Sequence, residues 1–424
     1  MRVKEIKIEG LFDMFDHTIP LNMEERLSIV YGINGIGKSM LFKILNSLFN
    51  LDSDNVFNFH RYPFTCFKIT YESGDMLMIE NLGEGYMKIT FNQNGEIETL
   101  FDNKKELDDL KRDKSTNQNI KHIQELRDLM DSKNTPQGSK NQNLISSKLK
   151  NVLGQTKMFF IETQRLIIFK RQEKSTIANL LSKDSFDKYD SVELYSTEMS
   201  EIIQSKRKER DKLSNSLQQS LHKRILDNSV QTNYSFEELN AVSASIEKRI
   251  EELKEVGLLE GVQMDNFKVT EDVDALKRAI LSVNIQDIQK TLSIFDDLYP
   301  KFQKFIEILN ERRLSFKKIS LSENGFTFTN DKGKILNAND LSSGEQHELV
   351  LLYLLLFKIP ENSLILIDEP EISLHITWQK AFLDDMKDII KLRNFDIIVA
   401  THSPAIINGN WDLTIKLDGH GENE

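Results

Sequence analysis

The sequence predicts an α/β protein whose mixed sheet is antiparallel in its N-terminal part and is split by a helical insertion. Three observations predict this fold class. The first hundred residues alternate apolar and polar side chains between turn formers, which indicates antiparallel hairpins. The last ninety residues place continuous apolar runs between helical patterns, which indicates a parallel sheet covered on both faces. Between about residues 170 and 316 the chain has a helical pattern and is almost free of Gly and Pro.

A chain of 424 residues is long enough for about two to three folding units. The predicted segments are 1–102 with antiparallel strands, a polar and partly mobile connection at 103–157, a strand and loop at 158–169, the helical insertion at 170–316 and a C-terminal α/β part at 317–424. The connection is assigned from its turn formers and its shortage of apolar side chains.

Individual elements follow from local patterns. Strands are predicted around 6–8 and at 27–31, 67–71, 158–161, 364–367 and 397–400, with turns at 73–75 and 94–95, a hairpin at 319–335, and helices at 345–357 and 378–391. Ser235 and Glu238 form a capping-box signature for a helix that starts there.

The strongest periodic pattern is an apolar stripe from Ile285 to Leu309 with spacings that alternate between three and four residues. Pro300 should kink or interrupt this helix. We favour an ordinary core-facing stripe in a compact helical domain, and a partner-binding arm is the alternative.

Charge and composition exclude several classes of protein. The chain has 55 Lys and Arg against 66 Asp and Glu, which gives a net charge of −11. Binding to nucleic acid would therefore need a local basic surface. Cys66 is the single cysteine, which excludes an intramolecular disulfide framework. No run of about 18 apolar residues and no signal-peptide pattern occurs. We expect a soluble, cytoplasmic protein without a membrane partner.

A Gly-rich loop, GINGIGKS at 32–39, follows the strand at 27–31 and opens a helix. Such a loop lets backbone N–H groups and the helix N-terminus surround a triphosphate. The candidate ATP-binding residues are Gly32, Asn34, Gly35, Gly37, Lys38 and Ser39. Lys38 would reach the terminal phosphates, and Ser39 would coordinate Mg²⁺. The alternative is a Gly-rich turn without a ligand.

Asp368 and Glu369 end the buried strand at 364–367. Two carboxylates are costly there unless they serve a metal or a reaction, although a solvated helix cap is the simpler alternative. Asp368 can hold Mg²⁺, and Glu369 can polarise the attacking water. His402 follows the next strand, where it can hydrogen-bond a phosphate, and a structural histidine is its alternative.

A second anion-binding surface is predicted at LSSGEQ, residues 341–346, directly before an apolar helix. Ser342, Gly344 and the helix N-terminus would form it. The same residues also satisfy an ordinary helix cap, and both interpretations can hold together.

Together, GINGIGKS, LSSGEQ, LILIDEP and VATHS resemble, in this order, the ATP-binding-cassette ATPase heads of the RecF, Rad50, SMC and OLD-like group. The resemblance covers about residues 1–100 and 320–417. It implies a P-loop head split by a helical insertion, and a homodimer, or a higher oligomer built on dimers, with ATP and Mg²⁺ at its interface. In such a dimer Ser342 and Gly344 complete the partner copy's site.

The same resemblance assigns further residues. Gln164 lies where the family has its Q-loop, so it is implied as a contact to Mg²⁺ and water. Residues 370–375 resemble the D-loop of OLD-like ATPases, with His375 where several relatives carry Asp, which leaves its role across the dimer open.

More narrowly, DEPEISLHITWQ and THSPAIINGNWDLTIKL resemble the ATPase subunit of Septu-type anti-phage systems, also found with some retrons. That resemblance implies an ATPase that regulates a separate HNH nuclease. We also expect no metal-dependent nuclease domain after His402, because about twenty residues follow it. The alternatives are a DNA-repair or chromosome-handling ATPase and a slow-turnover nucleotide-sensing scaffold.

Basic runs at 206–210 and 223–224 leave DNA or another nucleic acid open as a partner. Because basic runs on helices are usually solvated faces, we favour that simpler interpretation.

Overall fold

The computed structural model describes residues 1–49, 62–83, 86–102, 104, 147–162, 191–226, 234–260, 275–372 and 374–418. The chain forms two compact units: unit 1 is Met1–Ser182 with Ile359–Glu424, and unit 2 is Lys183–Lys358. This division differs from the boundary at 317 placed from the sequence, because residues up to 358 fold with the helical insertion.

The first sheet of unit 1 is antiparallel and has six strands. They are β1 (Val3–Leu11), β2 (Phe15–Pro20), β4 (Cys66–Tyr71), β5 (Met76–Gly83), β6 (Tyr86–Gln93) and β7 (Glu96–Asp102), in the order β2-β1-β4-β5-β6-β7. Asn94 and Gly95 both adopt positive φ, 53° and 92°, between β6 and β7. This confirms the predicted hairpin turn, since such a turn favours Asn-Gly.

The second sheet of unit 1 is parallel. Its strands are β3 (Leu27–Tyr31), β8 (Lys157–Glu162), β12 (Ser363–Asp368), β13 (Asp396–Thr401) and β14 (Thr414–Lys416), in the order β14-β3-β13-β12-β8. Leu364 and Ile365, which point to opposite faces of β12, are both buried. The sheet is therefore covered on both faces, and the mixed α/β fold class is confirmed.

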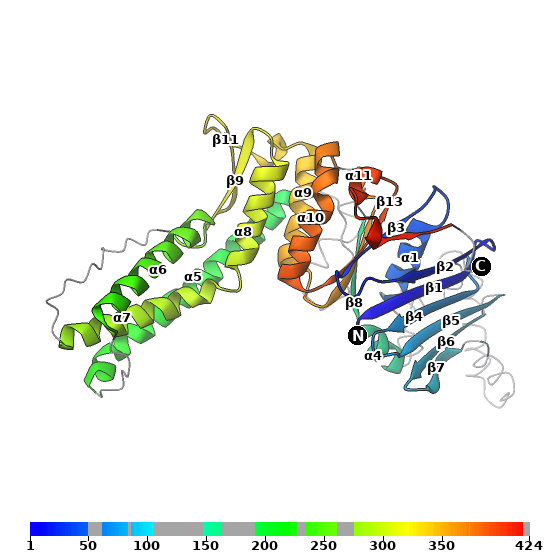
Figure 1. Cartoon of the computed structure of the whole chain (residues 1–424), viewed down its shortest axis with the longest axis horizontal. Helices are drawn as coiled ribbons and strands as arrows, with labels where there is room; N and C mark the ends of the chain where they lie inside the picture. The colour runs from blue at the N-terminus through cyan, green and yellow to red at the C-terminus, as the bar shows by residue number, and fades with distance from the viewer. Residues whose placement is uncertain are drawn as a thin grey trace, which may run out of the picture. The chain divides into compact units, whose positions relative to one another are not determined.

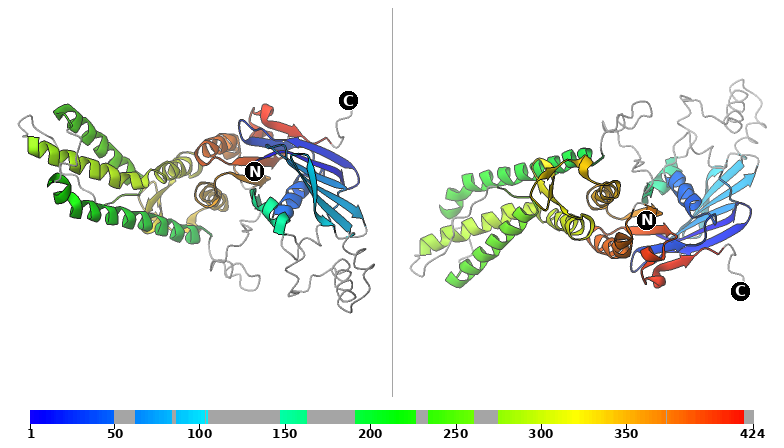
Figure 2. Two further views of the ribbon diagram at one scale, coloured as in Figure 1. Left: turned by 90° about the horizontal axis from the view of Figure 1, so that it is seen from below. Right: turned by 90° about the horizontal axis from the view of Figure 1, so that it is seen from above.

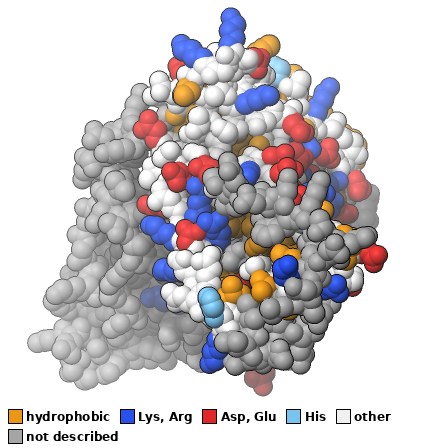
Figure 3. Space-filling model, turned by 90° about the vertical axis from the view of Figure 1, so that its left-hand side faces the viewer, with side chains coloured by type: hydrophobic (Ala, Val, Ile, Leu, Met, Phe, Trp, Pro, Cys, Tyr) orange, Lys and Arg blue, Asp and Glu red, His pale blue; other side chains and the backbone are white. Residues whose placement is uncertain are grey.

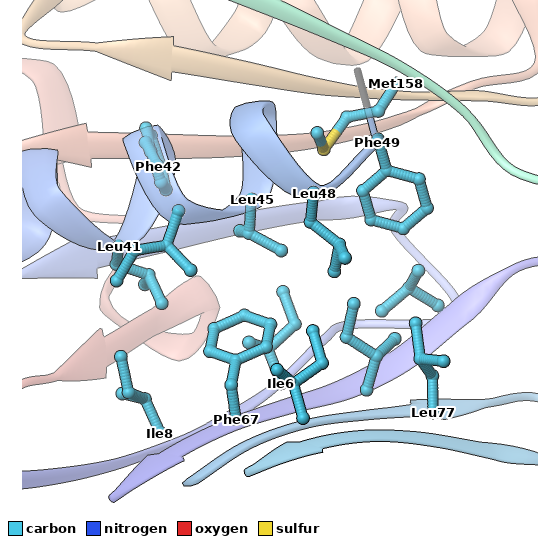
Figure 4. Close-up of a cluster of buried hydrophobic side chains, with 14 of the residues drawn as sticks. Ile6, Ile8, Leu41, Phe42, Leu45, Leu48, Phe49, Phe67, Leu77 and Met158 are labelled. Carbon is cyan, nitrogen blue, oxygen red and sulfur yellow. The ribbon is translucent and has the colours of Figure 1, made fainter. Parts of the chain in front are cut away.

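Helix α1 (Lys38–Phe49) anchors the core of unit 1. Its side chains Leu41, Leu45 and Leu48 face Ile6 and Phe67 of the antiparallel sheet (Figure 4). The same buried cluster includes side chains from β12 and β13 of the parallel sheet. Helix α1 therefore joins the two sheets through one hydrophobic core. The other α-helices in the described part of this unit are α4 (Ser147–Gly154), α10 (Ile376–Arg393) and α11 (Pro404–Ile407).

Unit 2 contains long helices and a small antiparallel sheet. Its helices are α5 (Ser191–Leu226), α6 (Phe236–Glu255), α7 (Ala275–Leu292), α8 (Tyr299–Glu307) and α9 (Ser343–Tyr353), with π-helical turns η4 (Ile308–Arg313) and η6 (Leu354–Lys358). Its strands β9 (Lys317–Ser322), β10 (Gly325–Asn330) and β11 (Ile335–Leu336) pair in the order β11-β10-β9. Helix α7 packs against both α5 and α6 (Figures 1 and 2). The capping box of Ser235 and Glu238 is present at the start of α6.

The apolar stripe from 285 to 309 belongs to the core of unit 2. Ile285, Leu292, Phe302 and Leu309 are all buried. The helix is interrupted after Leu292, and Pro300 occupies the first turn of α8, where its missing N–H is tolerated. Both the interruption and the core-facing interpretation are confirmed.

The basic runs on α5 are largely paired within unit 2. Arg207 donates to the carbonyl oxygens of Gly257 and Leu258, each at 3.0 Å. Arg224 forms an ion pair of 2.6 Å with Asp287. On the face shown in Figure 3, Lys and Arg side chains are interspersed with Asp and Glu. These contacts favour the structural interpretation of the basic residues. In the described part of the chain, no helix is both long enough and apolar enough to cross a bilayer.

A buried ion pair connects two elements of unit 2. Nε of Arg313, at the end of η4, donates to Oε2 of Glu348 on α9 over 2.6 Å, and the two side chains are only 1% and 3% exposed. Removing one partner of such a pair leaves the other charge buried, which costs more than losing a surface pair.

We expect Arg313→Met to lower the free energy of unfolding by about 3–5 kcal/mol, measured by urea denaturation followed by circular dichroism. Arg313→Met combined with Glu348→Leu should recover most of this loss, because no lone charge remains. Lys248→Met is the matched control, since that lysine is 78% exposed and pairs with Glu252 at 3.8 Å. Its effect should stay below about 1 kcal/mol, and an equally small effect of Arg313→Met would contradict the role of the buried pair.

Candidate nucleotide-binding site

The carboxyl ends of three adjacent parallel strands define the candidate site. Strand β13 lies between β3 and β12, with Tyr31 opposite Thr401 and Asp368 opposite Ala400. The Gly-rich loop follows β3, His402 follows β13, and Glu369 follows β12. Ligands bind at this edge of parallel α/β sheets. The register therefore brings together three motifs that lie far apart in the sequence.

The loop at 32–39 adopts a conformation that glycine permits. Gly35 and Gly37 have φ angles of +86° and +101°, in the left-handed region that other residues avoid. A Cβ built at Gly37 would lie 2.3 Å from Cδ2 of Leu11, whereas one at Gly35 would meet nothing within 4 Å. Gly37 is thus required for both backbone freedom and close packing against β1, and Gly35 for backbone freedom alone.

His17 supports this loop from the antiparallel sheet. Its buried Nε2–H donates to the carbonyl oxygen of Ile36 over 2.9 Å. Sequence analysis missed this residue, because a histidine on a short strand carries no local signal that it contacts a loop about twenty residues later.

Lys38 is the central side chain of the site. It is only 4% exposed, and its Nζ donates to the carbonyl oxygens of Gly32 at 2.8 Å and Ile33 at 3.2 Å. Burial lowers the pKa of Lys38, while the charges of Glu369, Asp368 and Glu371 act in the opposite direction. The three carboxylates therefore favour a charged ammonium in a partly desolvated position.

His402 lies between Lys38 and Glu369. Its Nδ1 is 3.2 Å from Nζ of Lys38, and its Nε2 is 3.6 Å from Oε1 of Glu369. An ammonium group only donates, so Nδ1 must accept and the proton of the neutral ring is on Nε2, facing the carboxylate. Glu369 itself adopts a positive φ of 48°. Such strained backbone is concentrated at functional sites.

The residues predicted to contact Mg²⁺ are Asp368, Ser39 and Gln164. Asp368 ends β12 beside Glu369, and Ser39 lies in the first turn of α1. Mg²⁺ takes oxygen ligands, often one or two protein groups together with phosphate oxygens and water, so Ser39 and Asp368 fit this metal. Gln164 lies outside the described residues. Within the described ranges, no three His, Cys, Asp or Glu side chains are grouped so that they could hold a metal by themselves.

Ser342 and Gly344 belong to unit 2. Ser342 caps α9: its hydroxyl accepts from the N–H of Glu345 at 3.3 Å, and Oε2 of Glu345 accepts from the N–H of Ser342 at 2.7 Å. Lys317 holds the same carboxylate oxygen at 2.8 Å. The capping interpretation is confirmed, and the role of Ser342 and Gly344 at a nucleotide stays a prediction.

A Gly-rich loop between a parallel strand and a helix, with a buried lysine and a carboxylate pair on a nearby strand, defines a P-loop nucleoside triphosphatase. The AAA ATPase domain family matches residues 1–407, and the chain belongs to this family. Membership of this family makes the chain an ATPase-type protein and implies that it binds ATP.

Individual relatives match over short stretches. The chain is 40% identical to protein ea59 of Escherichia phage lambda over 67 residues, which are 16% of this chain and 13% of that protein. It is 36% identical to a probable iron chelatin transport ATP-binding protein of Helicobacter pylori over 69 residues, 16% of this chain and 26% of that protein. The matches thus span a small part of each curated relative.

Among solved structures, the chain aligns with an Smc head domain with an extended coiled coil, derived from Pyrococcus furiosus and bound to the C-terminal domain of ScpA. The alignment covers 99% of this chain and 94% of that chain, with 15% identity and a TM-score of 0.36.

We expect Gly37→Ala to destabilise unit 1 more than Gly35→Ala. Both substitutions place a Cβ on left-handed backbone, at a cost of about 1–2 kcal/mol, but only Gly37→Ala also drives that atom into Leu11. The comparison is made by thermal denaturation without nucleotide. Equal losses in the two variants would show that packing against Leu11 does not constrain the loop.

Proposed function

We propose that the chain binds ATP with Mg²⁺ at the carboxyl edge of its parallel sheet and hydrolyses it. The observation that carries this proposal is the position of His402, whose ring lies 3.2 Å from Nζ of Lys38 and 3.6 Å from Oε1 of Glu369 at the ends of three adjacent strands. Lys38 and the loop N–H groups neutralise the phosphates, and Mg²⁺ compensates charge on the phosphate oxygens.

Each remaining group has a chemical role in this proposal. Glu369 accepts a hydrogen bond from the attacking water and orients it. His402, protonated on Nε2, donates toward the terminal phosphate when the Lys38 ammonium exchanges its protein acceptors for phosphate oxygens. Ser39 and Asp368 hold the metal, and Gln164 adds a contact to metal and water as the family resemblance implies.

We further propose that two copies share the nucleotide, with Ser342 and Gly344 of one copy completing the site of the other. The capped N-terminus of α9 supports this arrangement, because a helix N-terminus carries a partial positive charge that suits a phosphate. The proposal requires that ATP promotes association of the chain.

Two substitutions separate binding from hydrolysis. Lys38→Ala should lose ATP binding, because no other described side chain replaces its ammonium in the loop. Glu369→Gln should keep ATP affinity and lower kcat by about 10²- to 10⁴-fold. Equilibrium binding of a fluorescent ATP analogue and phosphate release measure the two effects. Near-normal turnover of Glu369→Gln would reject the role of this carboxylate.

Light scattering on the same two variants tests the dimer. Glu369→Gln should shift to a dimer when ATP is added, and Lys38→Ala should not. An unchanged mass of Glu369→Gln at saturating ATP would contradict a shared nucleotide. A DNA-handling ATPase would instead show strong stimulation by DNA without any partner protein, and a nucleotide-sensing scaffold would bind ATP without single-turnover hydrolysis.

We propose, finally, that ATP occupancy of this protein regulates a separate HNH-type nuclease in anti-phage defence. The motifs at 368–379 and 401–417 support this through their resemblance to Septu-type ATPase subunits. An HNH reading frame next to the coding sequence is the expected result. A gene without such a neighbour would count against the nuclease partner and leave the ATPase proposal intact.

A further inference from the structure

Glu371 lies in the 3-10 turn η7 (Pro370–Ile372), two residues after Glu369, and contacts the loop that carries His402. Its Oε1 accepts from the backbone N–H of His402 over 2.7 Å, and its Oε2 accepts from the hydroxyl of Thr401 over 2.8 Å. Hydrogen bonds to an ionised carboxylate are the stronger kind. One side chain thus fixes two consecutive residues at the end of β13.

The hydrogen bonds continue through this loop. Thr401 is fully buried, and its hydroxyl also accepts from the N–H of Ser403 over 2.9 Å. A buried hydroxyl has no access to water, so loss of Glu371 would leave it without that acceptor. Linked hydrogen bonds of this kind strengthen one another in a low-dielectric setting.

Gln379 on α10 forms a second connection. Its Nε2 donates to the carbonyl oxygens of Glu371 at 3.3 Å and Leu374 at 3.1 Å, and its Oε1 accepts from the hydroxyl of Ser403 at 2.7 Å. The turn after Glu369 and the loop after β13 are therefore held together at several points.

The ring of His402 depends on this backbone support. Its side chain is 29% exposed, so packing alone does not fix it. A shift of about 1 Å at a reacting group can cost roughly a hundredfold in rate. Fixing the backbone on both sides of His402 sets where its ring lies relative to Lys38 and Glu369.

We propose that Glu371 is a positioning residue for ATP hydrolysis, which holds the imidazole of His402 between Lys38 and Glu369 by fixing residues 401–403. This inference rests on the proposed ATP hydrolysis and adds a residue to which the sequence motifs assign no role. Glu371 does not itself touch the reacting atoms. Its charge also acts on Lys38, so its effect on His402 must be isolated with a variant that leaves this charge in place.

Steady-state kinetics tests the proposal. Glu371→Ala should lower kcat by about tenfold to a hundredfold and change the KM for ATP by less than about twofold. Thr401→Val should lower kcat in the same direction without changing any charge, and Thr401→Ser should recover most of that loss by restoring the hydroxyl. A raised KM with unchanged kcat would overturn the proposal.

A matched control variant and a double variant test whether the effect of Glu371 depends on His402. Glu361→Ala is the control, because this 56% exposed glutamate pairs with Arg393 near the amino end of β12, away from the site. In a His402→Ala background, Glu371→Ala should cause no further loss of kcat. Full additivity of the two losses would show that Glu371 acts independently of His402 and would overturn the proposal.

Amide hydrogen exchange tests this inference independently of the proposed function, because the measurement requires no ATP hydrolysis. Without nucleotide, the amide of His402 should exchange faster in Glu371→Ala than in the wild type and in Glu361→Ala. Unchanged exchange would overturn the positioning role whatever the ATPase result. Faster exchange in a protein that neither binds nor hydrolyses ATP would support the positioning role of Glu371 and reject the proposed function.

Discussion

The parallel register of β3, β13 and β12 is the constraint on which the site depends. Because a strand rises about 3.3 Å per residue, a slip of one residue would move a loop by more than the length of a hydrogen bond. Lys38, His402 and Glu369 reach one another only when the three strands end together. Buried residues on both faces of these strands hold that register. Those on one face of β12 join the core that α1 and both sheets share.

Several groups in the site are held in costly states. Lys38 is buried, and Glu369 has left-handed backbone. In this structure the ammonium is satisfied by two loop carbonyls and by the histidine ring. A phosphate would have to replace these acceptors, so nucleotide binding is an exchange of partners for Lys38. Ile36 of the loop and Leu41 of α1 belong to the hydrophobic core, whose burial offsets this local cost.

In unit 2, charged side chains pair with one another and apolar side chains are buried within the unit itself. The stripe on α7 and α8 is buried, the arginines of α5 pair within the unit, and Arg313 bonds Glu348 in its interior. Glu345, in the first turn of α9, is held both by its capping partner and by Lys317. The start of α9 is therefore held by side-chain contacts in addition to its backbone hydrogen bonds.

Local patterns in the sequence determined the fold class, the buried strands of the parallel sheet at 27–31, 364–367 and 397–400, the Gly-rich loop, the carboxylate pair and His402, because each of these depends on spacing within a few residues. Tertiary structure alone decided which of them meet. His17 supports Ile36, and Glu371 holds Thr401 and His402, through contacts between residues distant in sequence, and no local periodicity encodes such contacts. The boundary between the two units likewise depends on tertiary structure, since residues 317–358 belong to the same compact unit as the helices that precede them.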